Sequence, residues 1–424
     1  MSKRVMCIGV LVMVSLVHNA YGAVEFRDTT GDHLWKTAGN WYPTGVPGYG
    51  SGSVIIGGSN TCLIDSTTTA QTDAIYAGHS YRPAGTCYLN IDGSGSTLNV
   101  KGHFWLGASA NGYNCTTSLT NGAFVKTAWV TASSYTEIGA ASGSIGKLNI
   151  TGASTVFEPY ALNLGYSSGS NGQMYLYSGT VNFGGNLTIG RLGDGKLNLC
   201  GGSILNQAGS YNSIYMANAT GTTCTLWMTN GLINTANGGL VVGNVGSATV
   251  TMDGGEMDLG FLWLGTAANP YSSGVVHLNG GLIKLSGTNL SVKSGSTLDI
   301  TGGALSLGGT VTDITTYGNV TAYGGEGVFH YEYVSGPRTI VTALPVGIGN
   351  LWNEEAELST AQHITFSGTT RQGAFTDPGR TTLIEAGGNV YAFFRQYAGS
   401  GNFEIYRAVS TDGGVNFTVE YNPC

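Results

Sequence analysis

The chain has 424 residues, enough for two or three ordinary domains. Only 10% of the residues are charged, the formal net charge is −7 and no basic cluster occurs, so nucleic acid is a poor candidate partner. Gly contributes 69 residues and apolar residues make up 42% of the chain in regular alternation, which indicates a packed chain and excludes a disordered one.

The N-terminus has the features of an export signal. Lys3 and Arg4 precede the apolar run 5–17, and small residues occupy the −3 and −1 positions of a cleavage after Gly22. The run is too short to span a bilayer comfortably. We therefore expect residues 1–22 to be a signal peptide and the mature chain to have no transmembrane span. The predicted location is the cell surface or the extracellular space, with the periplasm as an alternative.

The segment 23–60 contains an aromatic stretch, HLWKTAGNWYPTGVPGYGSGSVII (33–56). It directly precedes a repeat array, and such arrays need their open ends covered. We predict that Trp35 and Trp41 belong to an aromatic cap on the first coil. The alternative is a platform on which these two tryptophans contact a glycan, because exposed aromatic residues mark binding sites.

Six cysteines follow the predicted signal peptide, which permits disulfides in an exported protein. Cys62 and Cys87 occur in similar contexts, NTCLID and GTCYLNID, 25 residues apart. If 25 residues form one turn of a repeat, the two cysteines lie on adjacent turns within bonding reach, so we expect them to form a disulfide. No Cys or His cluster has the spacing of metal ligands, and we expect neither a metal nor another cofactor.

A small residue after an apolar triplet recurs through the middle of the chain, at intervals of 32, 26, 25, 27, 26 and 22 residues. A second glycine, which ends a turn after an alternating strand, keeps step with it. The first anchor occurs at Gly107 (FWLG), Gly139 (TEIG), Gly165 (LNLG), Gly190 (LTIG), Ala217 (IYMA), Gly243 (LVVG) and Gly265 (LWLG).

The residues between the anchors alternate with period two, as in KLNLC (196–200) and TVTM (249–252), which indicates half-buried strands. Units of 22–32 residues are too short for propeller blades. We predict an all-β fold: a right-handed parallel β-helix (β-solenoid) of about nine coils over 61–311, with a small C-terminal antiparallel β segment. Glycines at the corners supply positive φ angles at low cost.

These motifs resemble the β-strand repeats of autotransporter-associated bacterial passenger proteins, of the LxIGxxGxGxLxxxGG kind. The segment 33–56 is similar to the W-x-x-x-x-N-W-x-x-G-x-P-G module that opens many such solenoids, although Ser51, Gly52 and Ser53 replace its usual Asp. The resemblance covers roughly residues 33–310. It implies a secreted, cell-surface architecture and specifies no activity.

The repeat ends after residue 311, and we expect residues 312–345 to form a C-terminal cap or connector. The stretch STDGGVNF then matches the S-x-D-x-G-x-x-F/W pattern of an Asp-box, a structural hairpin motif. Its key positions are Ser410, Asp412, Gly414 and Phe417.

The strands before the Asp-box resemble the first blade of sialidase-like propellers. The resemblance implies that Arg380 and Arg395 are remnants of an anion-binding site. A propeller needs four to eight blades, and 346–424 has room for one. Either the sequence belongs to a longer protein or the blade is a remnant used as a cap, and we expect the former.

The densest acidic group, MDGGEMDLG, contains Asp253, Glu256 and Asp258, and Arg191 or Asp194 is a candidate neighbour on another coil. Such carboxylates suit polysaccharide cleavage by the solenoid itself, although outward acids on a strand are usually solvated.

We therefore expect no catalytic residues and an exported structural or adhesive solenoid, with glycans or cell-envelope components as partners. The alternative is the N-terminal accessory region of a sialidase-like glycoside hydrolase that continues beyond residue 424.

Overall fold

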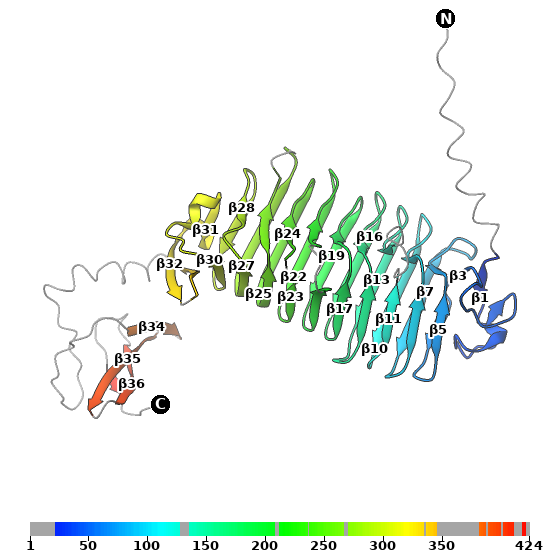
Figure 1. Cartoon of the computed structure of the whole chain (residues 1–424), viewed down its shortest axis with the longest axis horizontal. Helices are drawn as coiled ribbons and strands as arrows, with labels where there is room; N and C mark the ends of the chain where they lie inside the picture. Colours follow the sequence, from blue (N-terminus) through cyan, green and yellow to red (C-terminus); the bar gives the residue numbers. More distant parts are fainter. Residues whose placement is uncertain are drawn as a thin grey trace, which may run out of the picture. The chain divides into compact units, whose positions relative to one another are not determined.

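The computed structural model contains two units, Met1–Gly349 and Asn350–Cys424. Among the residues that it describes, the first unit is almost entirely β structure and forms a β-solenoid of about 11 turns (Figure 1). This confirms the predicted fold class. The described residues are 22–127, 135–207, 212–235, 237–266, 270–334 and 336–345, together with strands at 381–386, 389–399, 402–410 and 418–420.

Each turn of the solenoid, or coil, typically contains three short strands, and each strand pairs in parallel with its counterparts on the adjacent coils. One coil, for example, contains β13 (Ile145–Ile150), β14 (Val156–Pro159) and β15 (Leu162–Leu164). Stacking of equivalent strands produces two large sheets, here named sheet A and sheet B.

Sheet A has one strand from each coil and twelve strands in all. In order they are β2 (Trp41–Tyr42), β1 (Val24–Phe26), β3 (Ser53–Ile56), β6 (Ala74–Ala77), β9 (Phe104–Leu106), β12 (Thr136–Ile138), β15, β18 (Leu187–Ile189), β21 (Ile214–Met216), β24 (Gly239–Val242), β26 (Phe261–Leu264) and β28 (Leu290–Val292).

Sheet B contains the other two strands of each coil. The first series is β4 (Thr61–Ile64), β7 (Gly85–Asp92), β10 (Tyr113–Thr120), β13, β16 (Asn171–Leu176), β19 (Asp194–Leu199), β22 (Thr223–Met228), β25 (Ser247–Leu259), β27 (Ser273–Leu285), β29 (Thr297–Ile300) and β31 (Val320–Ala322). The second series is β5 (Thr69–Thr72), β8 (Thr97–Val100), β11 (Phe124–Thr127), β14, β17 (Thr180–Phe183), β20 (Ser203–Asn206), β23 (Leu232–Asn234), then the far ends of β25 and β27, and β30 (Ala304–Gly308).

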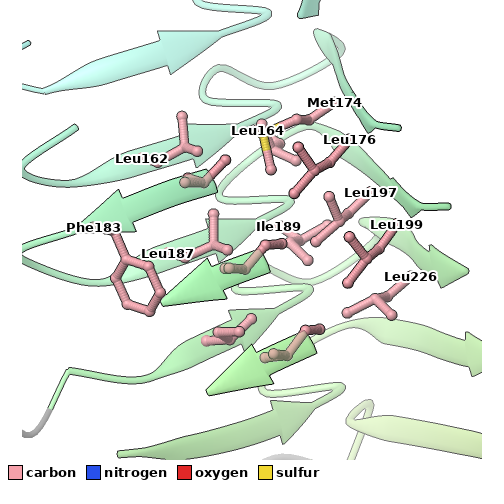
Figure 2. Packing of buried hydrophobic residues seen from close by; sticks show 14 of the residues in the cluster. Leu162, Leu164, Met174, Leu176, Phe183, Leu187, Ile189, Leu197, Leu199 and Leu226 are labelled. Carbon is pink, nitrogen blue, oxygen red and sulfur yellow. The ribbon is translucent and has the colours of Figure 1, made fainter. Parts of the chain in front are cut away.

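The core is a set of apolar ladders that run from coil to coil. Register places Met174 of β16 against Leu197 of β19, and Leu176 against Leu199. Figure 2 shows these side chains with their neighbours from sheet A, and all of those that it labels are buried. Because every second strand residue points inward, each coil buries its apolar face on the next.

The first sequence anchor lies at a corner after a sheet A strand and has a positive φ at all seven of its positions, between 54° at Ala217 and 76° at Gly190. The amide of the anchor donates a hydrogen bond to the preceding coil, as from Gly165 N to Ile138 O (2.8 Å). The predicted role of the corner glycines is therefore confirmed.

The two ends of the solenoid depart from the repeat. At the start, β1 pairs in parallel with β3 and antiparallel with β2, next to the 3-10 turn η2 (Ala38–Asn40). At the other end, the 3-10 turns η3 (Ile314–Tyr317) and η4 (Tyr323–Gly325) precede β32 (Gly327–Val334) and β33 (Arg338–Pro345), and β33 pairs antiparallel with both β32 and β30.

The second unit contains a four-stranded antiparallel sheet among its described residues. Its strands are β34 (Thr381–Ala386), β35 (Asn389–Gly399), β36 (Asn402–Ser410) and β37 (Thr418–Glu420).

Replacing a corner glycine will test the close stacking of coils. Gly165 has a φ of +66°, and an added Cβ would lie 2.2 Å from the backbone oxygen of Asp194. Gly221 has a φ of +81° with open space around it. We expect Gly221→Ala to lower the free energy of unfolding by about 1–2 kcal/mol, the backbone cost alone, and Gly165→Ala to lower it by clearly more. Chemical denaturation measures both, and equal losses would contradict the close packing at the corner.

Candidate functional site

The middle residue of each sheet A strand points away from the core, and parallel register aligns these residues into one ladder, here named the outer column of sheet A. In order they are Tyr76, Trp105, Glu137, Asn163, Thr188, Tyr215, Val241, Trp263 and Ser291. Several members are buried although they face outward: Glu137 is 1% exposed and Asn163 5%, whereas Trp263 is 44% exposed. The column is therefore closed to solvent at Glu137 and Asn163 and open to solvent at Trp263.

Three consecutive members of the column carry buried polar atoms that have no hydrogen-bond partner among the described residues. They are Trp105 Nε1, Glu137 Oε2 and Asn163 Nδ2. A buried polar atom without a partner costs about 1–3 kcal/mol. Three such atoms on adjacent coils leave a set of hydrogen-bonding groups unmet, with an indole N–H and an amide N–H on either side of a carboxyl group.

Aromatic rings border this group at its N-terminal end. The Trp105 ring makes an edge contact with Tyr76, with ring centroids 5.0 Å apart and an interplanar angle of 77°. It also meets the His103 ring at 5.1 Å. Trp105 is half-buried as a residue, although its Nε1 is buried.

A cation borders the same group on its other side. The Arg191 guanidinium lies 4.6 Å from the ring centroid of Tyr166 and 5.7 Å from that of Tyr135. Arg191 forms no ion pair with a described carboxylate at salt-bridge distance, but its charge acts on Glu137. Burial raises the pKa of Glu137 from 4.5 to about 8, and the nearby Arg191 offsets part of that rise. The Glu137 carboxyl is therefore mainly protonated at neutral pH and able to donate a hydrogen bond.

The sequence contains a signal for this site within the anchor triplets themselves. The middle residues of the anchor triplets are Trp, Glu, Asn, Thr, Tyr, Val and Trp, and the glutamate of TEIG is the single charged residue among them. The burial of Glu137 depends on tertiary packing, which the triplet alone does not encode.

The acidic group near Glu256 lies in a different environment. Glu256 pairs in register with Leu232 and Leu282, and Asp258 pairs with Asn234 and Lys284 on the outer face of sheet B. Both acids are half-buried.

The other candidate residues near this acidic group have partners elsewhere. Asp253 accepts hydrogen bonds from Trp227 Nε1 (2.6 Å) and Asn279 Nδ2 (2.9 Å), which lower the pKa of its carboxyl. Asp194 accepts from the Thr223 amide (2.9 Å). Because Arg191 lies against Tyr135 and Tyr166, the structure does not bring it to Glu256 as a catalytic pair would require.

Trp35 and Trp41 form the packed aromatic cap that we predicted as the first of two alternatives. Trp35 is 0% and Trp41 2% exposed, and their ring centroids are 4.8 Å apart in an edge contact. Trp41 Nε1 donates to Trp35 O at 2.7 Å, and Phe26 packs on the other side of Trp41. The rings leave no face for a sugar in this structure.

The five described cysteines are free, so the structure lacks the predicted Cys62–Cys87 disulfide. Cys62 stands opposite Leu89, whereas Cys87 stands opposite Cys115. The coil is 27 residues long at this point, two more than the spacing of Cys62 and Cys87, so these two cysteines are out of register.

The sialidase-like residues fall largely outside the described part of the chain. Arg380, Asp412, Gly414 and Phe417 are not described. Arg395 lies in β35, and Ser410 is the last residue of β36. The assignment of the Asp-box and of the anion-binding arginines therefore stays a prediction.

Comparisons with models of protein families, with curated proteins and with solved structures find no match. Within the described residues, no cluster of three or more His, Cys, Asp or Glu side chains is arranged to hold a metal ion. The same part of the chain contains no helix of the length and hydropathy that a membrane span requires.

The raised pKa of Glu137 predicts a pH-dependent stability. Below pH 4.5 the folded and unfolded states are both protonated, whereas between 4.5 and about 8 only the folded state keeps the proton. The free energy of unfolding must therefore fall as pH rises through this window. Between pH 5 and 8, we expect the wild type to lose about 3–4 kcal/mol more than Glu137→Gln. Chemical denaturation at both pH values measures this, with Glu158→Gln on β14 as the control, and parallel curves for wild type and Glu137→Gln would contradict it.

Thiol labelling will test the register of the cysteines. Burial raises the pKa of the Cys62 and Cys115 thiols and raises that of Cys224 to about 11. We expect these thiols to stay unmodified by a water-soluble alkylating reagent in the folded protein and to react fully in denaturant, because the thiolate is the reactive form. Peptide mass analysis without reductant measures the modification of each cysteine in the folded and in the denatured protein. A Cys62–Cys87 linked peptide would contradict the register described above.

Proposed function

We propose that this protein is an exported β-solenoid of the cell surface or extracellular space that acts as a structural or adhesive element, and that it binds a glycan through the outer column of sheet A. The observation that carries the proposal is the run of three unpartnered buried polar atoms on Trp105, Glu137 and Asn163. Such a run lowers the stability of the folded protein, and a ligand that completes the missing hydrogen bonds would account for its presence.

A neutral sugar suits the chemistry of this group. A sugar ring combines an apolar C–H face with hydroxyl groups that both donate and accept hydrogen bonds. The Tyr76–Trp105 pair offers an aromatic contact, and the indole N–H and the Asn163 amide offer donors. The protonated Glu137 carboxyl supplies a donor without requiring a cation in the ligand.

Export and surface location rest on the basic and apolar N-terminus and on the resemblance to passenger-protein repeats. A solenoid scaffold agrees with such a role because successive coils extend a regular surface along which ligands are displayed or bound. The alternative role, an accessory region of a sialidase-like glycoside hydrolase, rests on the C-terminal resemblance and is compatible with the same glycan site.

Two matched tryptophan substitutions test the glycan site. Trp105 and Trp263 occupy the same outer column, and Trp105→Phe removes the unpartnered indole N–H while keeping most of the ring. On immobilised neutral oligosaccharides (glucan, mannan, xylan, galactan and N-acetylhexosamine oligomers), we expect the wild type to bind at least one. For that oligosaccharide, Trp105→Phe should weaken binding about 5- to 10-fold, the loss of about one hydrogen bond.

The control variant Trp263→Phe should bind as the wild type does, because Trp263 lies five coils after Glu137 in the column, away from the unpartnered atoms. Titration calorimetry on the best oligosaccharide gives the affinities. Failure of the wild type to bind any neutral oligosaccharide, or equal losses in the two variants, would overturn the proposed site.

A further inference from the structure

A second surface lies on the outer face of sheet B, on strands that take no part in the sheet A site. Two outward ladders run side by side across β13, β16, β19 and β22. The first consists of Lys147, Gln173, Lys196 and Thr225, and the second of Asn149, Tyr175, Asn198 and Trp227. We name Lys147, Tyr175, Lys196, Asn198 and Trp227 the lysine–aromatic surface.

The two lysines of this surface flank a single aromatic ring. Lys147 Nζ lies 4.7 Å and Lys196 Nζ 5.9 Å from the ring centroid of Tyr175. Neither lysine forms an ion pair with a carboxylate among the described residues, whereas Lys126 pairs with Glu158 nearby. Two like charges at one ring repel each other, and one exposed cation–π contact contributes only about 0.5–1 kcal/mol. The arrangement therefore holds positive charge that an anion would neutralise.

The second ladder and the neighbouring Tyr177 provide exposed aromatic rings and a hydrogen-bond acceptor without a partner. Trp227 is 44% and Tyr177 49% exposed, and Tyr177 stacks on Tyr175 with an interplanar angle of 13°. Asn198 lies between Tyr175 and Trp227 in the ladder, is 6% exposed, and its Oδ1 is buried without a partner. A hydroxyl group held over Asn198 would satisfy this acceptor.

Acidic side chains at the edge of the surface are already engaged. Asp194 accepts from the Thr223 amide, and Asp253 accepts from Trp227 Nε1. The second of these bonds fixes the position of the Trp227 ring, and the Asp253 carboxylate keeps its negative charge. Lys147 and Lys196 are thus two cations beside aromatic rings on a chain of net charge −7.

We propose that the lysine–aromatic surface binds an acidic polysaccharide, a chain of sugar units that carry carboxylate or sulfate groups, lying along the solenoid axis. Parallel strands are spaced about 4.8 Å apart, so the two lysines, and likewise Tyr175 and Trp227, are about 10 Å apart. A sugar ring stacks on the exposed Trp227, a hydroxyl donates to Asn198 Oδ1, and the anionic groups meet Lys147 and Lys196 on either side of Tyr175. The proposal shares no residue with the sheet A site and does not depend on it.

The test compares two double variants that change the net charge equally. In the first, Lys147→Gln is combined with Lys196→Gln. In the control, Lys284→Gln is combined with Lys293→Gln, which alters lysines of later coils. The probes are polygalacturonate and chondroitin sulfate, with dextran as the neutral polymer and single-stranded DNA as a polyanion without sugar acids. Binding is measured at low and physiological salt.

We expect the wild type and the control variant to bind at least one acidic polysaccharide with equal affinity, and the Lys147/Lys196 variant to bind it at least tenfold more weakly, with a smaller dependence on salt. Trp227→Ala should also weaken binding, with the lysines intact. Neutral oligosaccharide binding at sheet A should be unchanged in all these variants, so the two proposals fail separately.

Three outcomes would overturn the proposal. One is the absence of binding to both acidic polysaccharides. Another is an equal loss of affinity in the two double variants, which would show that net charge alone explains the effect. The third is DNA binding as tight as polysaccharide binding and insensitive to Trp227→Ala, which would show attraction to any polyanion. Circular dichroism of each variant establishes that its β structure is intact.

Discussion

Parallel, in-register stacking of coils is the constraint on which the rest of this structure depends. Each coil donates and accepts main-chain hydrogen bonds with the coil before and the coil after it, so a residue stands directly against the equivalent residue of its neighbours. This requires a corner at the same place in every coil. The positive φ at Gly139, Gly165 and Gly190, and the hydrogen bond from each corner amide to the preceding coil, show how the chain meets that requirement.

Stacking also decides where specific chemistry can lie. Inward positions must repeat apolar residues of similar size, because each is packed against its counterparts on both sides. The outward positions are free to vary, and their ladders bring residues from distant parts of the sequence together. Glu137 and Asn163 are 26 residues apart in sequence but adjacent in the outer column of sheet A, and Asn198 lies next to Trp227 in the same way on sheet B.

The repeat made the solenoid predictable, since period-two strands and corner glycines are both local signals. The ends were less predictable, because β1, β2 and β33 do not carry the anchors. The structure accordingly has about 11 turns where the anchors indicate about nine. The disulfide prediction failed for a related reason: coil length varies, and a two-residue difference at Cys62 moved Cys87 out of register. Register is set by the sum of all turn lengths, which a pair of similar local contexts does not report.

The candidate sites were harder to predict because they are defined by burial and by missing partners. The sequence shows that Glu137 differs from the other triplet centres, and it shows Lys147 and Lys196 as scattered charges. Only the fold reveals that the glutamate is enclosed with an unpartnered oxygen and that both lysines approach one tyrosine ring.

A solenoid can tolerate such costs more easily than a globular domain of the same size. Its stability is approximately a sum of coil and nearest-neighbour terms, so an unfavourable residue in one coil is offset by the apolar ladders above and below it. Glu137 is flanked in its own strand by Thr136 and Ile138, both 0% exposed, and the inward residues of the adjacent sheet A strands β9 and β15 are buried in the same way. The core therefore does not require the outward glutamate, and a burial that stability alone does not explain favours a role in binding. Because the terms are local, the two outer surfaces can also change independently while the corners and the core remain fixed.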